Sequence, residues 1–250
     1  MVLDSLLNPV FYPLLNATGY FWTLLILSVV ITLITTLVYK YTTNQSLMKD
    51  LKDEQKALQK QIKELKNEPE KAMHAQKRMM EINGKYMMHS FKPMLYTFLP
   101  IIIFFGWMNS HLGYYPLMPN QEFSVTMNFD VNVGGEVNLI LPRGLNSISS
   151  LNQSIAAERA TWALKGDVGE YLLNYNFKGK TYSQQILISD QKEYKEPITR
   201  INKDGVKNIV ADLKPVMLLN LGFHTFGWLG SYIIFSMVIS IILRKVMKVY

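Results

Sequence analysis

The stretch KYTTNQSLMKDLKDEQKALQKQIKELKNEPEKAMHAQKRMMEINGKYMMHSFK, residues 40–92, decides how this 250-residue chain is organised. It holds twelve Lys or Arg residues against seven Asp or Glu, a net charge of +5 out of the chain's +7. Apolar runs long enough to cross a bilayer lie on both sides of it. We therefore expect this segment to stand off a membrane surface between two spans.

The segment has the pattern of two helices. Its first half follows a 3.5-residue repeat, at Met48, Leu51, Gln55, Leu58, Ile62 and Leu65. Asn67-Glu68-Pro69 interrupts helix propagation. Beyond it, spacings of three and four recur at Ala72, Ala75, Met79, Ile82 and Tyr86. The pattern predicts an antiparallel coiled-coil hairpin, and the alternative is a charged loop with no function of its own.

Three apolar runs predict a three-span α-helical membrane protein, with transmembrane helices at residues 20–39, 91–111 and 223–243. Basic residues gather in the middle segment and after the last run, at Arg244, Lys245 and Lys248. The positive-inside rule then places residues 40–90 and 244–250 in the cytosol. Residues 1–19, an amphipathic segment, and residues 112–222 are expected outside a plasma membrane. Anionic lipid headgroups account for the basic excess, and no direct DNA binding is expected.

Residues 112–222 change to short alternating runs separated by Gly, Asn and Pro. Strands are predicted at residues 123–129, 137–141, 160–164, 171–177 and 182–188, with turns at Gly134-Gly135, Gly166-Asp167 and Lys178-Gly179. This pattern predicts a small antiparallel β-sandwich outside the cell.

Three Asn-x-Ser/Thr sequences are present, at residues 16–18, 44–46 and 152–154. The motif is the acceptor for N-linked glycosylation, and it is also common by chance. The sequence at 44–46 is expected to stay unmodified because the charge pattern places it in the cytosol.

Composition argues against catalysis. The chain has no cysteine, which excludes disulfides and thiolate sites, and its four histidines lack metal-ligand spacing. No nucleotide-binding or hydrolase motif is present, and no Asp or Glu lies in the apolar cores of the spans. We predict no enzyme, no cofactor, no metal and no ion-coupled pump.

Polar residues recur every four positions along two spans: Ser28, Thr32, Thr36 and Lys40 on the first, and Ser236, Ser240 and Arg244 on the last. Each stripe ends in a base at its cytosolic end. Together they predict a polar groove open to the cytosol. The alternative is that the small hydroxyl residues serve helix packing or bond their own i−4 carbonyls.

Methionines crowd the second half of the middle segment, at Met73, Met79, Met80, Met87, Met88 and Met94. Flexible thioethers suit a surface that accepts varied hydrophobic helices, and Met87, Met88 and Met94 are the predicted substrate contacts. Core packing is the alternative. In the first half of the middle segment, four lysines are predicted to dock a partner protein: Lys52, Lys56, Lys60 and Lys63.

At the second span the chain resembles the archaeal YidC-like proteins and the third subunit of the eukaryotic ER membrane protein complex, members of the Oxa-type insertase superfamily. The resemblance rests on Leu99-Pro100, Gly106-Trp107-Met108-Asn109, Pro119, the strand at 123–129 and the run at 228–243. The order of span, cytosolic coiled coil, short span and last span is also similar.

The resemblance implies a three-helix core with a hydrophilic groove that helps hydrophobic segments of nascent membrane proteins enter the bilayer without nucleotide hydrolysis. Other membrane subunits are implied partners, and docking of a ribosome or targeting factor on the coiled coil is compatible with this function and with the scaffold interpretation below. Lys40 lies where related insertases place a basic groove residue, although at the end of its helix it also suits a snorkelling anchor. One rival interpretation is a scaffold or receptor that docks a cytosolic protein. Another is an ion channel, which the polar stripes of the first and last spans favour less.

Overall fold

The computed structural model describes residues 2–65 and 68–249, which form two compact units. The first, called here the sandwich unit, comprises residues up to 20 together with 107–228. The second, called the helical unit, comprises residues 21–106 and 229–250, apart from those outside the described ranges.

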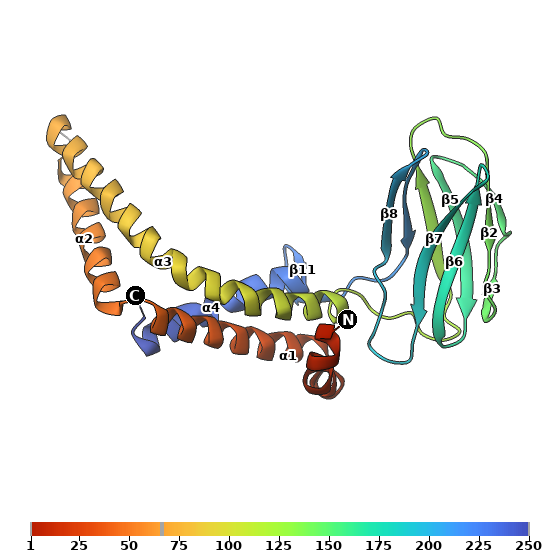
Figure 1. Ribbon diagram of the computed structural model, residues 1–250, viewed down its shortest axis with the longest axis horizontal. Coiled ribbons are helices and arrows are strands. Elements are labelled where there is room, and N and C mark those ends of the chain that lie inside the picture. The colour runs from red at the N-terminus through yellow and green to blue at the C-terminus, as the bar shows by residue number, and fades with distance from the viewer. Residues whose placement is uncertain (1, 66–67, 250) are drawn as a thin grey trace. The chain divides into compact units, whose positions relative to one another are not determined.

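The described residues form four helices: α1 (Val2–Thr42), α2 (Gln45–Glu64), α3 (Pro69–His111) and α4 (Trp228–Met247) (Figure 1). Three stretches are long and apolar enough to cross a membrane, and they are Leu7–Thr42, Pro93–His111 and Trp228–Met247. The prediction of three apolar helices beside a separate antiparallel β domain is thereby confirmed. Gly19 interrupts the helical backbone of α1 with φ 76° and ψ 178°, a conformation that favours glycine.

The last apolar helix begins later than the sequence predicts. Residues from 223 were expected to belong to it, but β10 (Met217–Asn220) and β11 (Thr225–Gly227) form a hairpin there. Gly222, with φ 85°, lies in the connection, and the Leu221 N–H donates to His224 O. Hydropathy does not register this turn chemistry, so the predicted boundary fell within the hairpin.

In the helical unit, α2 and the first half of α3 pack as a hairpin (Figure 1). Asn44 caps α2 by accepting from the Leu47 N–H at 3.2 Å, and α3 begins at Pro69, where a missing N–H costs no helical bond. The core of the hairpin contains residues from both predicted helical patterns: Leu51, Leu58, Ala75, Met79 and Ile82. Asn67 of the predicted break lies outside the described residues, which omit residues 66–67.

Two antiparallel sheets make the sandwich. The first has strand order β3-β5-β1-β9-β8 and the second β4-β2-β6-β7. Their bounds are β1 (Phe123–Phe129), β2 (Glu136–Ile140), β3 (Leu145–Ser147), β4 (Asn152–Ser154), β5 (Arg159–Gly166), β6 (Gly169–Phe177), β7 (Lys180–Ile188), β8 (Ile198–Lys203) and β9 (Val206–Ala211). The five predicted strands correspond to β1, β2, β5, β6 and β7. Sequence reasoning missed the others, which are three residues long or, like β8 and β9, shifted in register.

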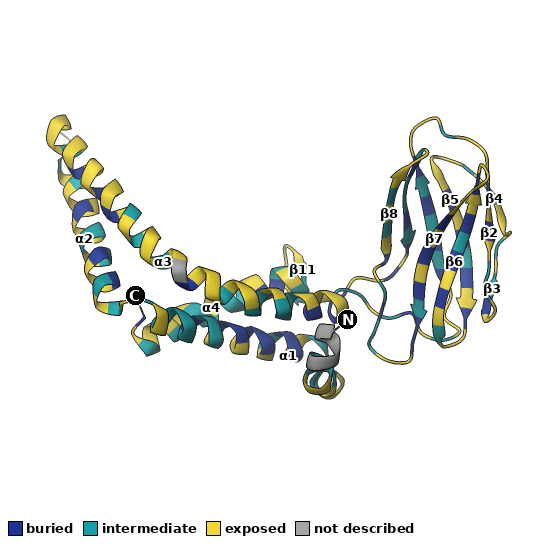
Figure 2. Cartoon of the chain, in the orientation of Figure 1, coloured by how far each residue is buried: buried dark blue, intermediate teal, exposed yellow. Residues whose placement is uncertain are grey.

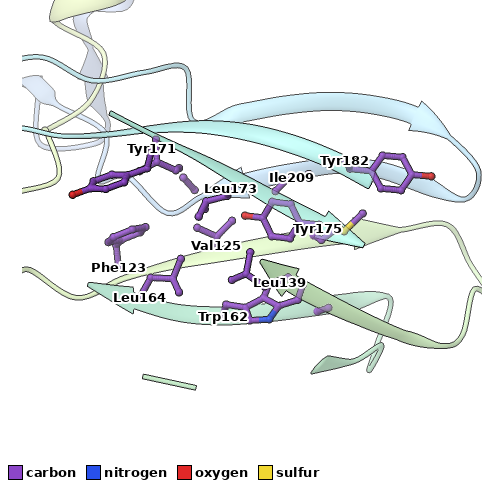
Figure 3. Close-up of a cluster of buried hydrophobic side chains, with 14 of the residues drawn as sticks. Phe123, Val125, Leu139, Trp162, Leu164, Tyr171, Leu173, Tyr175, Tyr182 and Ile209 are labelled. Carbon is purple, nitrogen blue, oxygen red and sulfur yellow. The ribbon is translucent and has the colours of Figure 1, made fainter. Parts of the chain in front are cut away.

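Alternating residues of the two sheets meet in one core (Figure 3). Every second residue of β1 is buried, from Phe123 to Phe129, as expected for a strand with one face on a core. Trp162 of β5 and Tyr175 of β6 bring the sheets together, with ring centroids 5.3 Å apart. The Trp162 Nε1–H donates to Leu151 O at 2.9 Å, so this large side chain is buried without an unpaired donor.

Polar contacts tie β7 of one sheet to the β8–β9 hairpin of the other. The buried Gln184 side-chain amide donates to Pro197 O at 3.0 Å and to Ile209 O at 3.3 Å. At the β8–β9 turn, the Asp204 carboxylate accepts from Lys180 Nζ and from the Tyr182 hydroxyl. The hydrogen bond from Lys180 lowers the pKa of Asp204 below its ordinary value, with a smaller contribution from Tyr182.

This lowered pKa predicts acid sensitivity. The stabilisation from Asp204 is complete above the unfolded carboxyl pKa of about 3.9 and is lost as the pH falls through the lower folded value. The melting temperature of the domain should therefore fall between pH 5 and more acidic conditions, and Asp204→Asn should make this fall smaller. Melting is followed by the circular dichroism signal of the β-strands.

Asp130→Asn is the matched control for Asp204, because Asp130 is an exposed carboxylate whose ion pair with Lys207 is 3.9 Å long. It should keep the acid-dependent loss of the unaltered chain. Identical pH profiles for Asp204→Asn and the unaltered chain would contradict the assignment.

The first part of α1 packs within the sandwich unit. The Trp107 Nε1–H donates to Asn8 Oδ1 at 2.8 Å, and Phe11 meets the Trp107 ring edge to face at 5.1 Å. His111, one of the four histidines without metal-ligand spacing, is buried and stacked on Trp107, with ring centroids 4.5 Å apart. The end of α3, which includes the Gly-Trp-Met-Asn sequence, is thus anchored to the start of the chain.

Asn8→Leu should destabilise this unit by about 1–3 kcal/mol, because the buried Trp107 indole would lose its acceptor. The measurement is thermal unfolding of the full-length chain in detergent. Asn16→Leu, at an exposed position of the same helix, serves as the control and should change stability little. Equal shifts for the two variants would contradict a specific role for Asn8.

Candidate functional site

A cluster around Tyr39 joins the three apolar helices of the helical unit. The Tyr39 hydroxyl of α1 lies 3.4 Å from Ser90 Oγ of α3, and the Arg244 guanidinium of α4 lies 5.1 Å from the centre of the Tyr39 ring. Burial, and then the hydrogen bond with Tyr39, raise the pKa of Tyr86. We call Tyr39, Tyr86, Ser90 and Arg244 the Tyr39 cluster. It lies where the hairpin meets the spans.

Ring contacts join the same helices at their other ends. Phe21 of α1 meets Phe235 of α4 edge to face at 5.6 Å, and Phe105 of α3 meets Tyr232 of α4 at 4.8 Å. Such contacts add about 0.5–1.5 kcal/mol beyond the burial of area. α4 is therefore held to both other spans.

The predicted polar stripe of α1 is buried in the helical unit. Ser28 Oγ donates to Leu24 O at 2.7 Å, and Thr36 Oγ1 donates to Thr32 O at 2.6 Å. These two hydroxyls are satisfied by the i−4 carbonyls of their own helix, so helix packing accounts for them. The Thr32 hydroxyl differs, because it is buried and has no hydrogen-bond partner among the described residues.

The other residues of the predicted groove are spread over two helices. Lys40 is half-buried at the end of α1, and its carbonyl accepts from Gln45 Nε2 at 3.4 Å. Ser236 Oγ donates to Ile233 O of its own helix, and Ser240 is half-buried. Of these residues, Arg244 alone takes part in the Tyr39 cluster.

α3 carries both buried and exposed residues along its length (Figure 2), and its methionines between residues 73 and 94 are of both kinds. Met79 is buried in the hairpin core, whereas five others are exposed: Met73, Met80, Met87, Met88 and Met94. Four of the exposed ones are spaced by seven residues, two helical turns, and therefore share a face. Phe91 and Phe98, with 59% and 57% exposure, continue this face into the span. We call Met73, Met80, Met87, Phe91, Met94 and Phe98 the methionine face.

The four lysines predicted to dock a partner lie on α2. Lys56 and Lys60 are exposed and form long ion pairs with Asp53, at 3.8 Å, and Glu64, at 3.9 Å. Exposed pairs of this kind contribute little to stability. Lys63 is exposed and Lys52 is half-buried. No group of three or more His, Asp or Glu residues able to hold a metal is found within residues 2–65 and 68–249.

A family model for integral membrane proteins of the EMC3/TMCO1-like type matches residues 2–155. The chain belongs to the EMC3/TMCO1-like family. This family is part of the Oxa-type insertase superfamily. The match covers α1, α2, α3 and the first four strands, and no curated protein or solved structure matches the chain. The resemblance seen in the sequence is thus confirmed at the level of the superfamily.

Sequence reasoning missed Tyr39, Tyr86 and Ser90. Tyr86 was assigned only to the hairpin repeat, and Tyr39 only to the end of an apolar run. The available signal was the position of a tyrosine at a membrane boundary, where an amphipathic ring with a hydroxyl is favoured. The contact with Arg244, more than 200 residues away, is tertiary and leaves no local pattern.

The Tyr39 cluster predicts a measurable coupling between α1 and α4. A double-mutant cycle of Tyr39→Leu and Arg244→Gln, with unfolding followed in detergent, should give about 0.5–1 kcal/mol. The control cycle replaces Arg244→Gln by Lys245→Gln, at the neighbouring exposed base, and should give no coupling. A Tyr39–Arg244 value equal to that of the control would contradict the contact.

Proposed function

We propose that this protein is a membrane insertase that accepts hydrophobic segments of nascent membrane proteins from the cytosol and eases them into the bilayer. The observation that carries the proposal is the methionine face, whose exposed apolar residues recur along one helix from the hairpin into the second span, with Lys77 and Gly84 between them. Membership of the EMC3/TMCO1-like family supports the same role. The protein would assemble with nascent clients and other membrane subunits.

The methionine face suits varied apolar clients. Met73, Met80 and Met87 lie before the span that begins at Pro93, and each is at least 65% exposed. An apolar helix that docks there removes its own surface and that of the thioethers from water, which favours binding by about 25 cal/mol per Å². Because methionine is unbranched and flexible, different client shapes can be accommodated.

The second span offers a favourable exit from this face. It is the shortest of the three candidate spans, with 19 residues. Pro93 and Pro100 lie inside α3 and remove the helical donors for the carbonyls of His89 and Tyr96. A short helix with unbonded carbonyls favours local thinning and hydration of the bilayer, which lowers the barrier for a client entering beside it.

The orientation that this function requires follows from charge. The middle segment and the C-terminal bases lie on the cytosolic side by the positive-inside rule, with the sandwich outside a plasma membrane. Lys40 and Arg244 then stand at the cytosolic boundary, beside the path of a client. The unpartnered Thr32 hydroxyl marks the place in α1 where a polar client group could bind within the helical unit.

The test is insertion by the reconstituted full-length chain. Replacing Met73, Met80 and Met87 together by Ser removes three apolar contacts, each worth on the order of 1 kcal/mol, and should reduce client insertion about tenfold or more. Replacing the same three by Leu should keep insertion of a matched client. Site-specific photocrosslinks to ribosome-bound nascent chains from position 88, which is exposed and is not replaced in these variants, should fall in parallel.

Gln59→Ser and Gln61→Ser together form the matched control, because these residues are exposed on α2 of the same hairpin but are polar. This variant should insert clients normally. If the variant with three serines inserts clients as well as the control does, the methionine face does not take part in insertion. The scaffold interpretation is then favoured.

A further inference from the structure

The three Asn-x-Ser/Thr sequences of the chain lie in three different structural settings. They begin at Asn16 in α1, at Asn44 before α2 and at Asn152 in β4. Addition of an oligosaccharide requires a side-chain amide that can be reached and a fold that tolerates a large polar group. The structure therefore discriminates among three motifs that sequence alone cannot rank.

Asn44 is committed to capping a helix. Its Oδ1 accepts from the Leu47 N–H at 3.2 Å and from Ser46 Oγ at 2.7 Å, and Ser46 is the hydroxyl residue of the same motif. The hairpin that Asn44 begins is also the most basic part of the chain, which the positive-inside rule keeps in the cytosol.

Asn16 lies inside a helix and within the candidate span Leu7–Thr42. The hydroxyl residue of its motif, Thr18, donates to Leu14 O at 2.8 Å. The adjacent Leu15 is fully buried, and its carbonyl accepts from Lys192 Nζ at 2.8 Å. Asn16 is itself exposed, but the backbone of its motif and the Thr18 hydroxyl are held in the helix.

Asn152 has the opposite environment. It begins β4, which is the edge strand of the four-stranded sheet and pairs only with β2. Asn152 and Ser154 are both exposed. The Asn152 Oδ1 accepts from Asn138 Nδ2, while its own Nδ2 has no partner among the described residues. The amide nitrogen that would carry a sugar is therefore the atom that the fold leaves unused.

The sheet next to Asn152 presents an uncharged polar row. Asn152 is in register with Asn138 of β2, Asn138 with Asn176 of β6, and Asn176 with Thr181 of β7. All four residues are exposed. Amides and hydroxyls can hydrogen-bond to sugar hydroxyls without the desolvation of a charge. A glycan would also cover the unpaired edge of β4, where a bare strand invites association with other chains.

We propose that Asn152 is an N-glycosylation site and that Asn16 and Asn44 are not modified. The donor is an oligosaccharide linked to a polyisoprenyl diphosphate. The bond between the anomeric carbon and the diphosphate oxygen breaks, and a bond between that carbon and Asn152 Nδ2 forms. The amide loses one proton, the lipid diphosphate leaves, and no electrons are exchanged with another reactant. The inference requires the sandwich to be outside the cytosol, and it does not depend on insertase activity.

The experiment translates the full-length chain in the presence of rough microsomes. A single band shift that is reversed by endoglycosidase is expected, with the sugar assigned to Asn152 by glycopeptide mass spectrometry. Asn152→Gln and Ser154→Ala should each abolish the shift, and Ser154→Thr should keep it. Asn16→Gln and Asn44→Gln should leave it unchanged.

Gly134→Thr provides the matched positive control. It completes a new motif with Asn132 and Val133 in an exposed loop of the same domain, where an added Cβ at position 134 meets nothing within 4 Å. This variant should show a second shift. The proposal is overturned if the new motif is modified while Asn152 is not, or if neither motif is modified. Modification at Asn44 would overturn both the site and the orientation.

Discussion

The molecule depends on the continuity of α3 through its two prolines. Pro93 and Pro100 cannot donate backbone hydrogen bonds, yet the helix continues from Pro69 to His111. Two long-range contacts hold its path, from Ser90 to Tyr39 and from Trp107 to Asn8. Because α3 does not end between the hairpin and the span, one helix joins the two, and the methionine face runs along both.

The division of α3 into two faces explains why its methionines have different roles. Met79 and Ile82 pack against α2, and this packing fixes the rotation of α3 about its axis. The methionine face is then directed away from the hairpin core, because Met73 and Met80 lie one or two positions along the helix from the buried Ala75, Met79 and Ile82. Packing and the proposed client binding are therefore compatible in this segment, because they involve different sides of the helix.

The spans and the hairpin could be predicted from sequence because their signals are local. A run of apolar residues or a repeat of three and four is visible within one helix. The buried face at Leu51, Leu58 and Met79 follows the predicted repeat, and the strands with clean alternation, such as 123–129, lie where predicted. Short strands such as β3 and β4 carry too few residues for a period to be recognised.

The candidate site was less predictable, since its contacts join distant parts of the chain. The four-residue spacing of Ser28, Thr32 and Thr36 was visible, but their hydrogen bonds were not. Sequence could not tell that two of these hydroxyls bond their own helix while the third does not. Tyr39 was missed because an aromatic residue at a span end has many uses, and its partners lie on two other helices.

Each sheet of the sandwich has two edge strands, β3 and β8 in one and β4 and β7 in the other. The β7 and β8 edges are tied together more firmly than the β3 and β4 edges. Gln184 and Asp204 bridge β7 to the β8–β9 hairpin, whereas β3 and β4 are each held by three paired residues. Local opening of the domain should therefore begin along β3 and β4, with the β7–β8 side the last to exchange its amide protons. An edge that frays at little cost to the core tolerates bulk, charge or insertions, so sequence drift can concentrate there while the domain keeps its fold.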